Sequence, residues 1–351
     1  MGAMRAIAVK PGHPETAGII DLPEPPESDG SILLRTRLIG ICGTDLEISI
    51  DGYGTPPSGE DRLVLGHESL GEVVDAPAAS GFKPGDLVVG VVRRPDPVPC
   101  GACAVDEWDM CRNGRYVERG IKERHGYGSE RVRVDPRFAI PVDPALGELG
   151  ILVEPTSVVA KAWEQVERIA TRAWFQPKVA LVTGAGPIGL LAAMLARQRG
   201  YETYVTARRR EGLKPRLVEE LGATYYTGPL RDLPVAPDVV IECTGAGRVA
   251  VDAVLRAAPS AIICLTGLSH GSDPIEGRPG EMNNELVLGN KVAFGTVNAA
   301  RRHYDQAAEA LARADRDWLG RMITRRLPAD QWPSALKKGP DDIKVVIDMT
   351  A

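Results

Sequence analysis

The sequence lacks the features that mark secreted, membrane-spanning or nucleic-acid-binding proteins. Its 351 residues include only six cysteines, too few for a disulfide framework in a chain of this size. No secretory signal is recognisable at its start, and no internal repeat or low-complexity segment stands out. The net charge of −5 leaves no overall basic footprint for nucleic acid. We therefore expect a cytoplasmic protein that binds neither a membrane nor nucleic acid.

One uncharged stretch, residues 179–196, is long enough to raise the question of a transmembrane helix. A Gly-Ala-Gly-Pro sequence interrupts it, and its two halves differ in character. Residues 178–183 are apolar and β-rich, whereas residues 190–199 are good helix formers with basic residues in the last turn and a glycine after them. The stretch therefore predicts a strand, a tight turn and a helix.

The turn carries the pattern Gly-x-Gly-x-x-Gly, which in this strand–turn–helix context indicates dinucleotide binding. The first glycine permits the tight turn, the second lets the backbone approach a diphosphate, and the third lets the helix pack on the strand. The helix N-terminus adds N–H groups and a partial positive charge. A turn that binds no phosphate is the alternative. The predicted cofactor contacts are Gly184, Gly186, Pro187, Ile188 and Gly189.

The end of the next predicted strand, residues 201–206, bears on which dinucleotide is bound. An acidic residue there would bind the ribose of NAD, but the sequence continues Ala-Arg-Arg-Arg. Arginine pairs bidentately with phosphate, so Arg208 and Arg209 favour the 2′-phosphate of NADP. A late Glu211 would allow some use of NAD, and a solvated basic loop is the alternative. Two later strands end in Thr-Gly, which adds Thr244 and Gly267 as cofactor contacts.

The length of the chain favours two domains, and its first half differs in kind from the region around the glycine turn. β-type patterns separated by Pro, Gly and Asp turns occur at residues 4–10, 31–39, 71–74 and 85–92. They predict a mainly-β, barrel-like domain. A predicted helix at 304–313 and a predicted strand at 343–348 are expected to return to it.

Three residues before the glycine turn offer donors that suit zinc: Cys42, His67 and Glu154. A thiolate, an imidazole and a carboxylate bind Zn²⁺ well, and three protein ligands leave one coordination position for water or substrate. Each residue alone has an ordinary alternative, because a single Cys is usually a small buried hydrophobe and a single His after Gly a loop residue.

A second group of donors is Cys100, Cys103 and Cys111. The Cys-x2-Cys spacing is a good chelating hairpin, and a third thiolate further along suits a tetrahedral structural zinc site. The alternatives are a loop without metal and a three-thiolate site that loses its metal easily.

The motifs around Cys42 and His67, followed by the glycine turn, resemble the zinc-dependent medium-chain dehydrogenase/reductase superfamily over nearly the whole chain. The resemblance implies a mainly-β GroES-like catalytic domain, residues 1–174 plus 298–351, and an inserted Rossmann doubly wound parallel sheet, residues 175–297, with the catalytic cleft between them. By this resemblance Cys42 and His67 hold a catalytic zinc, and Asp45 acts on His67. Thr44 relays the substrate's hydroxyl proton, and Glu68 is an occasional or alternate ligand.

The chain departs from the alcohol dehydrogenases of that superfamily at three positions. Its third catalytic ligand is Glu154 where they have Cys, which is typical of polyol and sugar dehydrogenases. Their relay histidine is matched by Glu47. Their four-cysteine lobe has its first ligand at Pro97 here, so the adjacent Asp96 is expected to complete a structural site with the three cysteines.

Other segments resemble the glucose dehydrogenase branch, namely residues 91–95, 115–121, 125–127, 150–155 and 297–298. In that branch the residues matching Glu118 and Asn298 contact sugar hydroxyls, and Asn298 is also expected to contact the cofactor. An exposed ion pair with Arg115 is the alternative for Glu118, and a loop position without substrate contact is the alternative for His125.

The resulting hypothesis is a zinc-dependent oxidoreductase similar to glucose 1-dehydrogenase, which oxidises C1 of an aldose to the lactone and reduces NADP. Its catalytic residues would be Cys42, Thr44, His67 and Glu154, and its substrate contacts Thr44, Glu118, Glu154 and Asn298. A homodimer or homotetramer is expected, with the strand at 291–297 as a pairing edge. The alternatives are the same apparatus acting on another polyol, an aminocyclitol or a secondary alcohol and, more remotely, a non-catalytic NADP-binding sensor.

Overall fold

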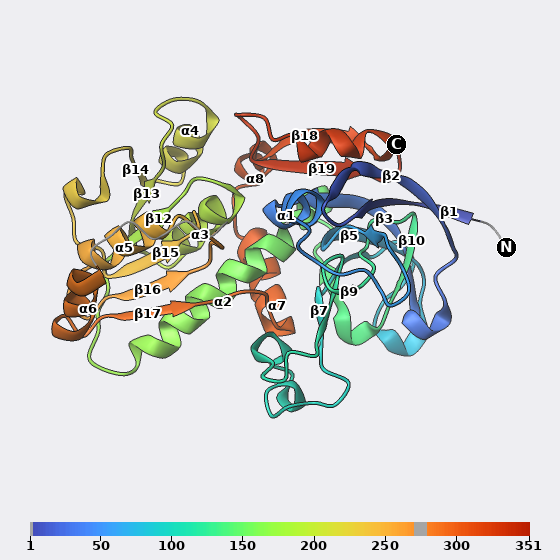
Figure 1. Cartoon of the computed structure of the whole chain (residues 1–351), viewed down its shortest axis with the longest axis horizontal. Coiled ribbons are helices and arrows are strands. Elements are labelled where there is room, and N and C mark those ends of the chain that lie inside the picture. Colours follow the sequence, from blue (N-terminus) through green and yellow to red (C-terminus); the bar gives the residue numbers. More distant parts are fainter. Residues whose placement is uncertain (1–2, 270–278) are drawn as a thin grey trace. The chain divides into compact units, whose positions relative to one another are not determined.

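The computed structural model describes residues 3–269 and 279–351, and the chain divides into two compact units (Figure 1). The first unit comprises Met1–Ser157 and Asn298–Ala351, and the second is the continuous segment Val158–Val297. Helix α2 (Val153–Ala170) begins in the first unit and continues into the second.

Within the described ranges, the second unit holds a six-stranded parallel sheet in the order β14-β13-β12-β15-β16-β17. This is the 3-2-1-4-5-6 order of a Rossmann doubly wound sheet. Its strands are β12 (Val179–Thr183), β13 (Glu202–Thr206), β14 (Thr224–Tyr226), β15 (Val239–Glu242), β16 (Ile262–Leu265) and β17 (Val292–Gly295). The helices are α3 (Pro187–Gln198), α4 (Leu213–Glu220), α5 (Gly247–Arg256) and α6 (Pro279–Leu288).

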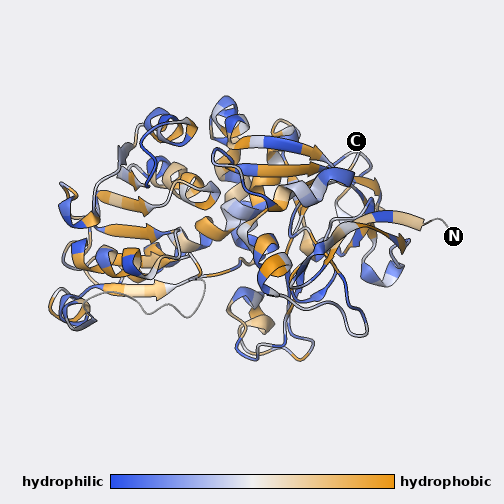
Figure 2. Ribbon diagram, turned by 45° about the horizontal axis from the view of Figure 1, so that its top comes forward, coloured by the Kyte–Doolittle hydropathy of each residue, from blue (hydrophilic) through white to orange (hydrophobic). Residues whose placement is uncertain are grey.

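The central strands of this sheet are continuous apolar runs, as expected for parallel strands covered on both faces. Figure 2 shows them in the hydrophobic colour. Leu181, Val240 and Ile263, from three adjacent strands, are completely buried in one core cluster. That core places the carboxyl ends of β12, β15 and β16 at one edge of the sheet, where ligands bind in such folds.

The first unit is mainly β. Among the described residues, its largest sheet has the order β11-β6-β5-β3-β19-β18, with β10 also paired to β3, and two smaller sheets have the orders β2-β1-β4 and β7-β8-β9. The strands are β1 (Ala3–Lys10), β2 (His13–Pro23), β3 (Ile32–Ile41), β4 (Leu63–Val64), β5 (Glu68–Asp75), β6 (Leu87–Gly90), β7 (Arg93–Arg94), β8 (Val117–Arg119), β9 (Glu123–Arg124), β10 (Arg131–Val134), β11 (Ala139–Val142), β18 (Ile323–Pro328) and β19 (Lys344–Asp348). Its helices are α1 (Gly43–Asp51), α7 (Arg301–Ala312) and α8 (Arg316–Met322).

The last strand of the chain joins the largest sheet of this unit, because β19 pairs antiparallel with β3 (Figure 1). In that register Val345 lies opposite Ile41, the residue before Cys42. The last strand of the chain therefore runs beside the segment that carries the first predicted zinc ligand.

The α/β fold class predicted from the sequence is confirmed. Two helices differ from expectation. The predicted helix at 304–313 begins earlier, at Arg301, because His303 Nδ1 accepts a hydrogen bond from the Ala300 N–H at 3.0 Å and caps the helix start. Helix α2 was not predicted from the sequence. In residues 3–269 and 279–351, we find no helix with both the length and the apolar character needed to cross a bilayer.

Candidate functional site

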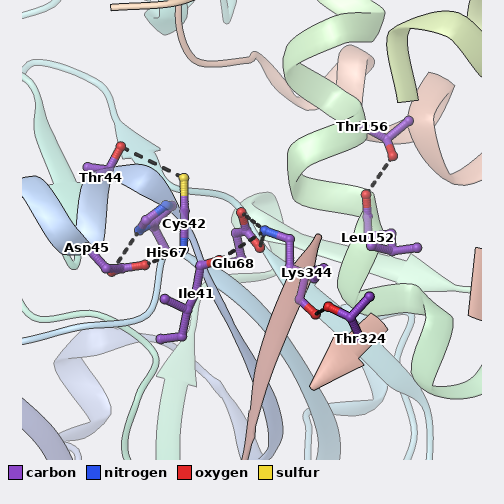
Figure 3. A network of polar contacts seen from close by, with 10 residues as sticks. All are labelled: Ile41, Cys42, Thr44, Asp45, His67, Glu68, Leu152, Thr156, Thr324 and Lys344. Carbon is purple, nitrogen blue, oxygen red and sulfur yellow. Dashed lines mark hydrogen bonds and ion pairs between the residues drawn. The ribbon is translucent and has the colours of Figure 1, made fainter. Parts of the chain in front are cut away.

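Three side chains able to ligate a metal converge in the first unit (Figure 3). The Cys42 thiol, a ring nitrogen of His67 and a carboxylate oxygen of Glu68 lie within 4.8 Å of one another. Cys42 precedes helix α1, His67 precedes β5, and Glu68 is the first residue of β5. His67 is 4% exposed and Glu68 only 1%, so these two members are shielded from water, whereas Cys42 is partly exposed.

Asp45 orients two members of this cluster. Its Oδ2 accepts a hydrogen bond from the Cys42 N–H at 2.9 Å, which caps the start of α1, and its Oδ1 lies 3.5 Å from His67 Nδ1. Burial lowers the pKa of His67, but the adjacent Asp45 carboxylate and the Cys42 thiol together outweigh this effect and hold that pKa well above its usual range. One ring nitrogen of His67 thus faces a carboxylate, and the ring also lies close to Cys42 and Glu68. Metal-ligating histidines commonly have this arrangement.

Thr44 lies beside the cluster, in the first turn of α1. The Cys42 thiol and the Thr44 hydroxyl oxygen are 3.9 Å apart (Figure 3). The predicted proton relay therefore begins next to the predicted metal ligand.

Glu154, in the first turn of α2, is 7% exposed. Its carboxylate is not one of the three groups that share the 4.8 Å cluster in the described residues. Burial raises the pKa of Glu154 to about 7, His67 acts in the opposite direction, and the negative charge of Glu68 adds to the rise. The Glu154 carboxylate therefore interacts electrostatically with His67 and Glu68 without belonging to their cluster.

Lys344 is a partner of the cluster that sequence reasoning missed. Its Nζ donates to Glu68 Oε1 at 2.6 Å, to Glu68 Oε2 at 2.5 Å and to the Ile41 carbonyl at 3.3 Å (Figure 3). Both side chains of this ion pair are 1% exposed. The available signal was a lysine inside the otherwise apolar strand at 343–348, because a charge at such a position must find a partner.

The second predicted metal site is also a cluster. The sulfur atoms of Cys100, Cys103 and Cys111 lie within 4.8 Å of one another. Backbone N–H groups, that of Arg112 first, lower the pKa of the Cys100 thiol to about 6, whereas burial raises the pKa of the Cys103 thiol to about 11. A thiol that ionises this readily is ready to bind a cation.

The carboxylate of Asp96 makes other contacts. Its Oδ1 accepts a hydrogen bond from the Val98 N–H at 2.8 Å, and its Oδ2 lies 3.4 Å from Arg115 Nε. Among the described residues, the structure thus brings the three thiols together without the Asp96 carboxylate in their cluster.

The two predicted sugar contacts lie side by side. Asn298 Nδ2 donates to Glu118 Oε1 at 2.8 Å. The cation paired with Glu118 is Arg93, at 3.0 Å, and not Arg115, which the sequence neighbourhood had suggested. His125 is bonded elsewhere, with its Nε2 2.8 Å from Glu60.

The glycine turn of the second unit shows why each glycine is needed. Gly184 has a φ of +92°, and its N–H donates to the Thr206 carbonyl at 2.7 Å. A Cβ at Gly189 would lie 1.8 Å from the Gly184 carbonyl oxygen, so only glycine packs there. A Cβ at Gly186 would meet no protein atom within 4 Å. Packing therefore explains the first and third glycines, and the second leaves open space before α3, where the sequence predicts the diphosphate.

The ends of the neighbouring strands are joined by a buried carboxylate, Glu242. Its Oε1 accepts hydrogen bonds from the Thr183 hydroxyl at 3.0 Å and the Thr244 N–H at 2.7 Å, and its carbonyl accepts from the Gly267 N–H at 3.2 Å. The predicted contacts Thr244 and Gly267 are thereby held at the same edge as the glycine turn. Arg208 and Arg209 are exposed just beyond β13.

Two family models match consecutive parts of the chain. The one described as Alcohol dehydrogenase GroES-like domain matches residues 28–144, and the one described as Glucose dehydrogenase C-terminus matches residues 147–349. Curated relatives include the glucose 1-dehydrogenases of Methanocella arvoryzae, 38% identical over 361 residues, and Thermoproteus tenax, 40% identical over 352 residues. The first alignment covers 99% of this chain and 100% of the relative, and the second covers 99% of each.

A solved glucose dehydrogenase structure also matches the chain over nearly its full length. The chain is similar to Haloferax mediterranei glucose dehydrogenase in complex with NADP, Zn and gluconolactone, with a TM-score of 0.91 and 34% identity. The match covers 99% of this chain and 100% of the other.

Proposed function

The chain belongs to the glucose dehydrogenase family of zinc-dependent medium-chain dehydrogenases, and we propose that it oxidises the C1 hydroxyl of an aldose, glucose foremost, to the lactone with NADP as hydride acceptor. The observation that carries this proposal is the close group of Cys42, His67 and Glu68 in a chain that matches its relatives over their full length. A related enzyme has been solved with NADP, zinc and gluconolactone bound.

The donors of the first cluster suit Zn²⁺, because thiolate, imidazole and carboxylate are its usual protein ligands. Cys42, His67 and Glu154 would hold the ion, with Glu68 as the alternate ligand. Asp45 Oδ1 and His67 Nδ1 are both buried and neither has a hydrogen-bond partner in the described residues. A histidine that ligates a metal commonly turns its other ring nitrogen toward a carboxylate, and these two atoms match that arrangement. When bound, zinc lowers the pKa of the hydroxyl group that it contacts.

The residues of the chain then have separate tasks. Thr44 Oγ1 accepts the proton of the C1 hydroxyl and passes it outward from the site. C1 gives its hydride to the nicotinamide. The lactone carbonyl forms as the O–H and C–H bonds break. Asp45 keeps His67 in position. Glu118 and Asn298 bind hydroxyl groups of the sugar and orient C1.

The second unit supplies the cofactor site. The open space at Gly186 and the N-terminus of α3 would receive the diphosphate. Arg208 and Arg209, exposed after β13, would pair with the 2′-phosphate.

The test is reduction of NADP in the presence of a panel of aldoses, polyols and cyclitols, with and without a chelator. Turnover of glucose that the chelator removes, and added zinc restores, is the expected result. Turnover of a cyclitol or polyol alone would contradict the substrate class and leave the zinc–NADP chemistry intact. Full activity after verified removal of zinc would contradict the zinc mechanism.

Replacing Arg208 and Arg209 with alanine should weaken the binding of NADP and not that of NAD. Two charge-assisted contacts to phosphate are lost, so we expect the Kd of NADP to rise by about tenfold to a hundredfold, while the Kd of NAD stays within about twofold. Titration of each dinucleotide, followed by protein fluorescence, measures both constants.

The matched control is Arg231→Ala, which removes an exposed arginine of the same unit that pairs with Asp232. It should leave both constants unchanged. An unaltered ratio of the two constants in the Arg208→Ala, Arg209→Ala protein would remove these residues from the 2′-phosphate site.

A further inference from the structure

Arg93 is a buried cation to which the proposed chemistry gives no role. It lies in β7, opposite Glu118 of β8 in the strand register, and is 4% exposed. Its Nε and its Nη2 both lie 3.0 Å from Glu118 Oε1. A buried guanidinium is costly unless it is paired, and Glu118 is its partner.

The other sides of the guanidinium are also fixed. Nη1 donates to the carbonyl of Asp109 at 3.1 Å, in the segment between Cys103 and Cys111. The face of the group lies on the ring of Tyr116, 3.7 Å from the ring centroid. Because the guanidinium is planar, contacts on two edges and one face define its position completely.

The two oxygens of Glu118 are used differently. Oε1 accepts from Arg93 and from Asn298 Nδ2, whereas Oε2 makes no hydrogen bond with any residue that the structure describes. The Glu118 side chain is 9% exposed. A carboxylate has about four acceptor positions, so those of Oε2 remain open to a ligand.

Asn298 is held just as firmly. Its backbone has a φ of +62°, a left-handed conformation, and its side-chain Oδ1 accepts from the Ala299 N–H at 2.8 Å. With the oxygen engaged there, the amide nitrogen faces Glu118. Asn298 and Arg93 therefore hold the same oxygen of the carboxylate.

The pairing also differs from the common fork-to-fork arrangement. Arginine and a carboxylate frequently form a bidentate pair, with one N–H on each oxygen. Here both N–H contacts fall on Oε1. This geometry saturates one oxygen and leaves the other unbonded.

We propose that Arg93 is a positioning residue for the substrate: it fixes Glu118 through Oε1, so that Oε2 accepts a hydrogen bond from one hydroxyl of the sugar. The inference rests on the proposed function, because it takes an aldose as the ligand. It makes Arg93 a determinant of which sugars are accepted, since a carboxylate oxygen held in one place distinguishes hydroxyl configurations.

The test compares steady-state kinetics of Arg93→Met, Arg93→Lys, Glu118→Gln and the double variant Arg93→Met, Glu118→Gln. We expect Arg93→Met to raise the KM for glucose by about tenfold to a hundredfold with a much smaller change in kcat, because a charge-assisted contact to substrate is misplaced. Arg93→Lys should lie between it and the wild type. The double variant should be no worse than Glu118→Gln alone, because Arg93 acts through Glu118.

Monodeoxyglucoses supply a readout that mere loss of stability would not change. In the wild type, the deoxy sugar that lacks the hydroxyl bound by Oε2 should lose affinity relative to glucose. In Arg93→Met that difference should largely disappear, while the differences for the other deoxy sugars remain.

Arg94→Met is the matched control. Arg94 is the neighbouring buried arginine of β7, it bonds to the Val91 carbonyl and the Tyr127 hydroxyl, and it stacks on Phe138. This variant should leave the KM for glucose within about twofold, because Arg94 does not contact Glu118. An equal rise in KM in Arg94→Met, or additive losses in the double variant, would overturn the proposal. If the wild type oxidises glucose and Arg93→Met has the same KM as the wild type, the proposed role of Arg93 is overturned and the proposed function stands. If the wild type is inactive on every sugar, both the role of Arg93 and the proposed function are overturned.

Discussion

Replacing His67 with alanine should abolish turnover while leaving the binding of NADP intact. His67 is a proposed zinc ligand, and we expect its loss to remove several kcal/mol of transition-state stabilisation; about 5 kcal/mol corresponds to a rate lower by roughly four orders of magnitude. The glycine turn belongs to a different compact unit, so the Kd of NADP should stay within about twofold, as expected for independent sites. Stopped assays for kcat and fluorescence titration for Kd measure the two effects separately.

The control for this prediction is His13→Ala. His13 is an exposed histidine of the first unit whose Nδ1 lies 3.1 Å from Glu15. It should leave activity and zinc content unchanged. Equal losses of turnover and of NADP affinity in His67→Ala would show that the two units are not independent, and a fully active His67→Ala protein would exclude His67 as a ligand.

Replacing Lys344 with methionine should strongly destabilise the first unit. It would leave the Glu68 carboxylate, 1% exposed, without its cation, and removing one partner of a buried ion pair typically costs about 3–5 kcal/mol. Adding Glu68→Gln removes the stranded charge, so the double variant should recover most of the loss. Urea unfolding of chelator-treated protein measures these differences without the binding energy of the metal.

This pair also determines a pH dependence. Burial lowers the pKa of Lys344, but the charge and hydrogen bonds of Glu68, together with the charges of Cys42 and Glu154, outweigh this effect and hold that pKa above its ordinary value. A raised pKa in the folded state means that the stabilisation is complete at neutral pH and is lost only as the pH rises through the raised pKa.

The control for the stability of Lys344→Met is Lys338→Met, which removes an exposed lysine nearby in the chain. A Lys344→Met protein as stable as this control would show that Glu68 does not need a cation.

Local patterns were sufficient for much of the fold. The strand, glycine turn and helix at 178–199 follow from residues that are neighbours in the sequence, and the α/β fold class was correct. The resemblance to sugar dehydrogenases, carried by motifs such as the one around Cys42, is confirmed by the family models and relatives. The structure brings Cys42, His67 and Glu68 together, and the roles assigned to them stay predictions.

The partners of the site residues could not be predicted in this way. Lys344 and Glu68 are separated by 276 positions, and Arg93 and Glu118 by 25. Their contacts depend on the register of β19 on β3 and of β7 on β8, which no local pattern specifies. Sequence proximity instead suggested Arg115 as the partner of Glu118, although its guanidinium lies near Asp96. The sequence therefore indicated which residue types belong to the site, but it did not indicate which residues distant in the chain pair with them.

The discontinuity of the first unit has a consequence for how the protein is made. The segment Val158–Val297 is complete before the ribosome reaches the end of the chain, and domains generally fold as units during synthesis. The cluster of Cys42, His67 and Glu68, however, acquires Lys344 only with the last strand. A nascent chain halted before that strand should therefore already bind dinucleotide while it still lacks the cation beside Glu68. For this enzyme, retention on a cofactor column would therefore not distinguish a finished molecule from a prematurely released one.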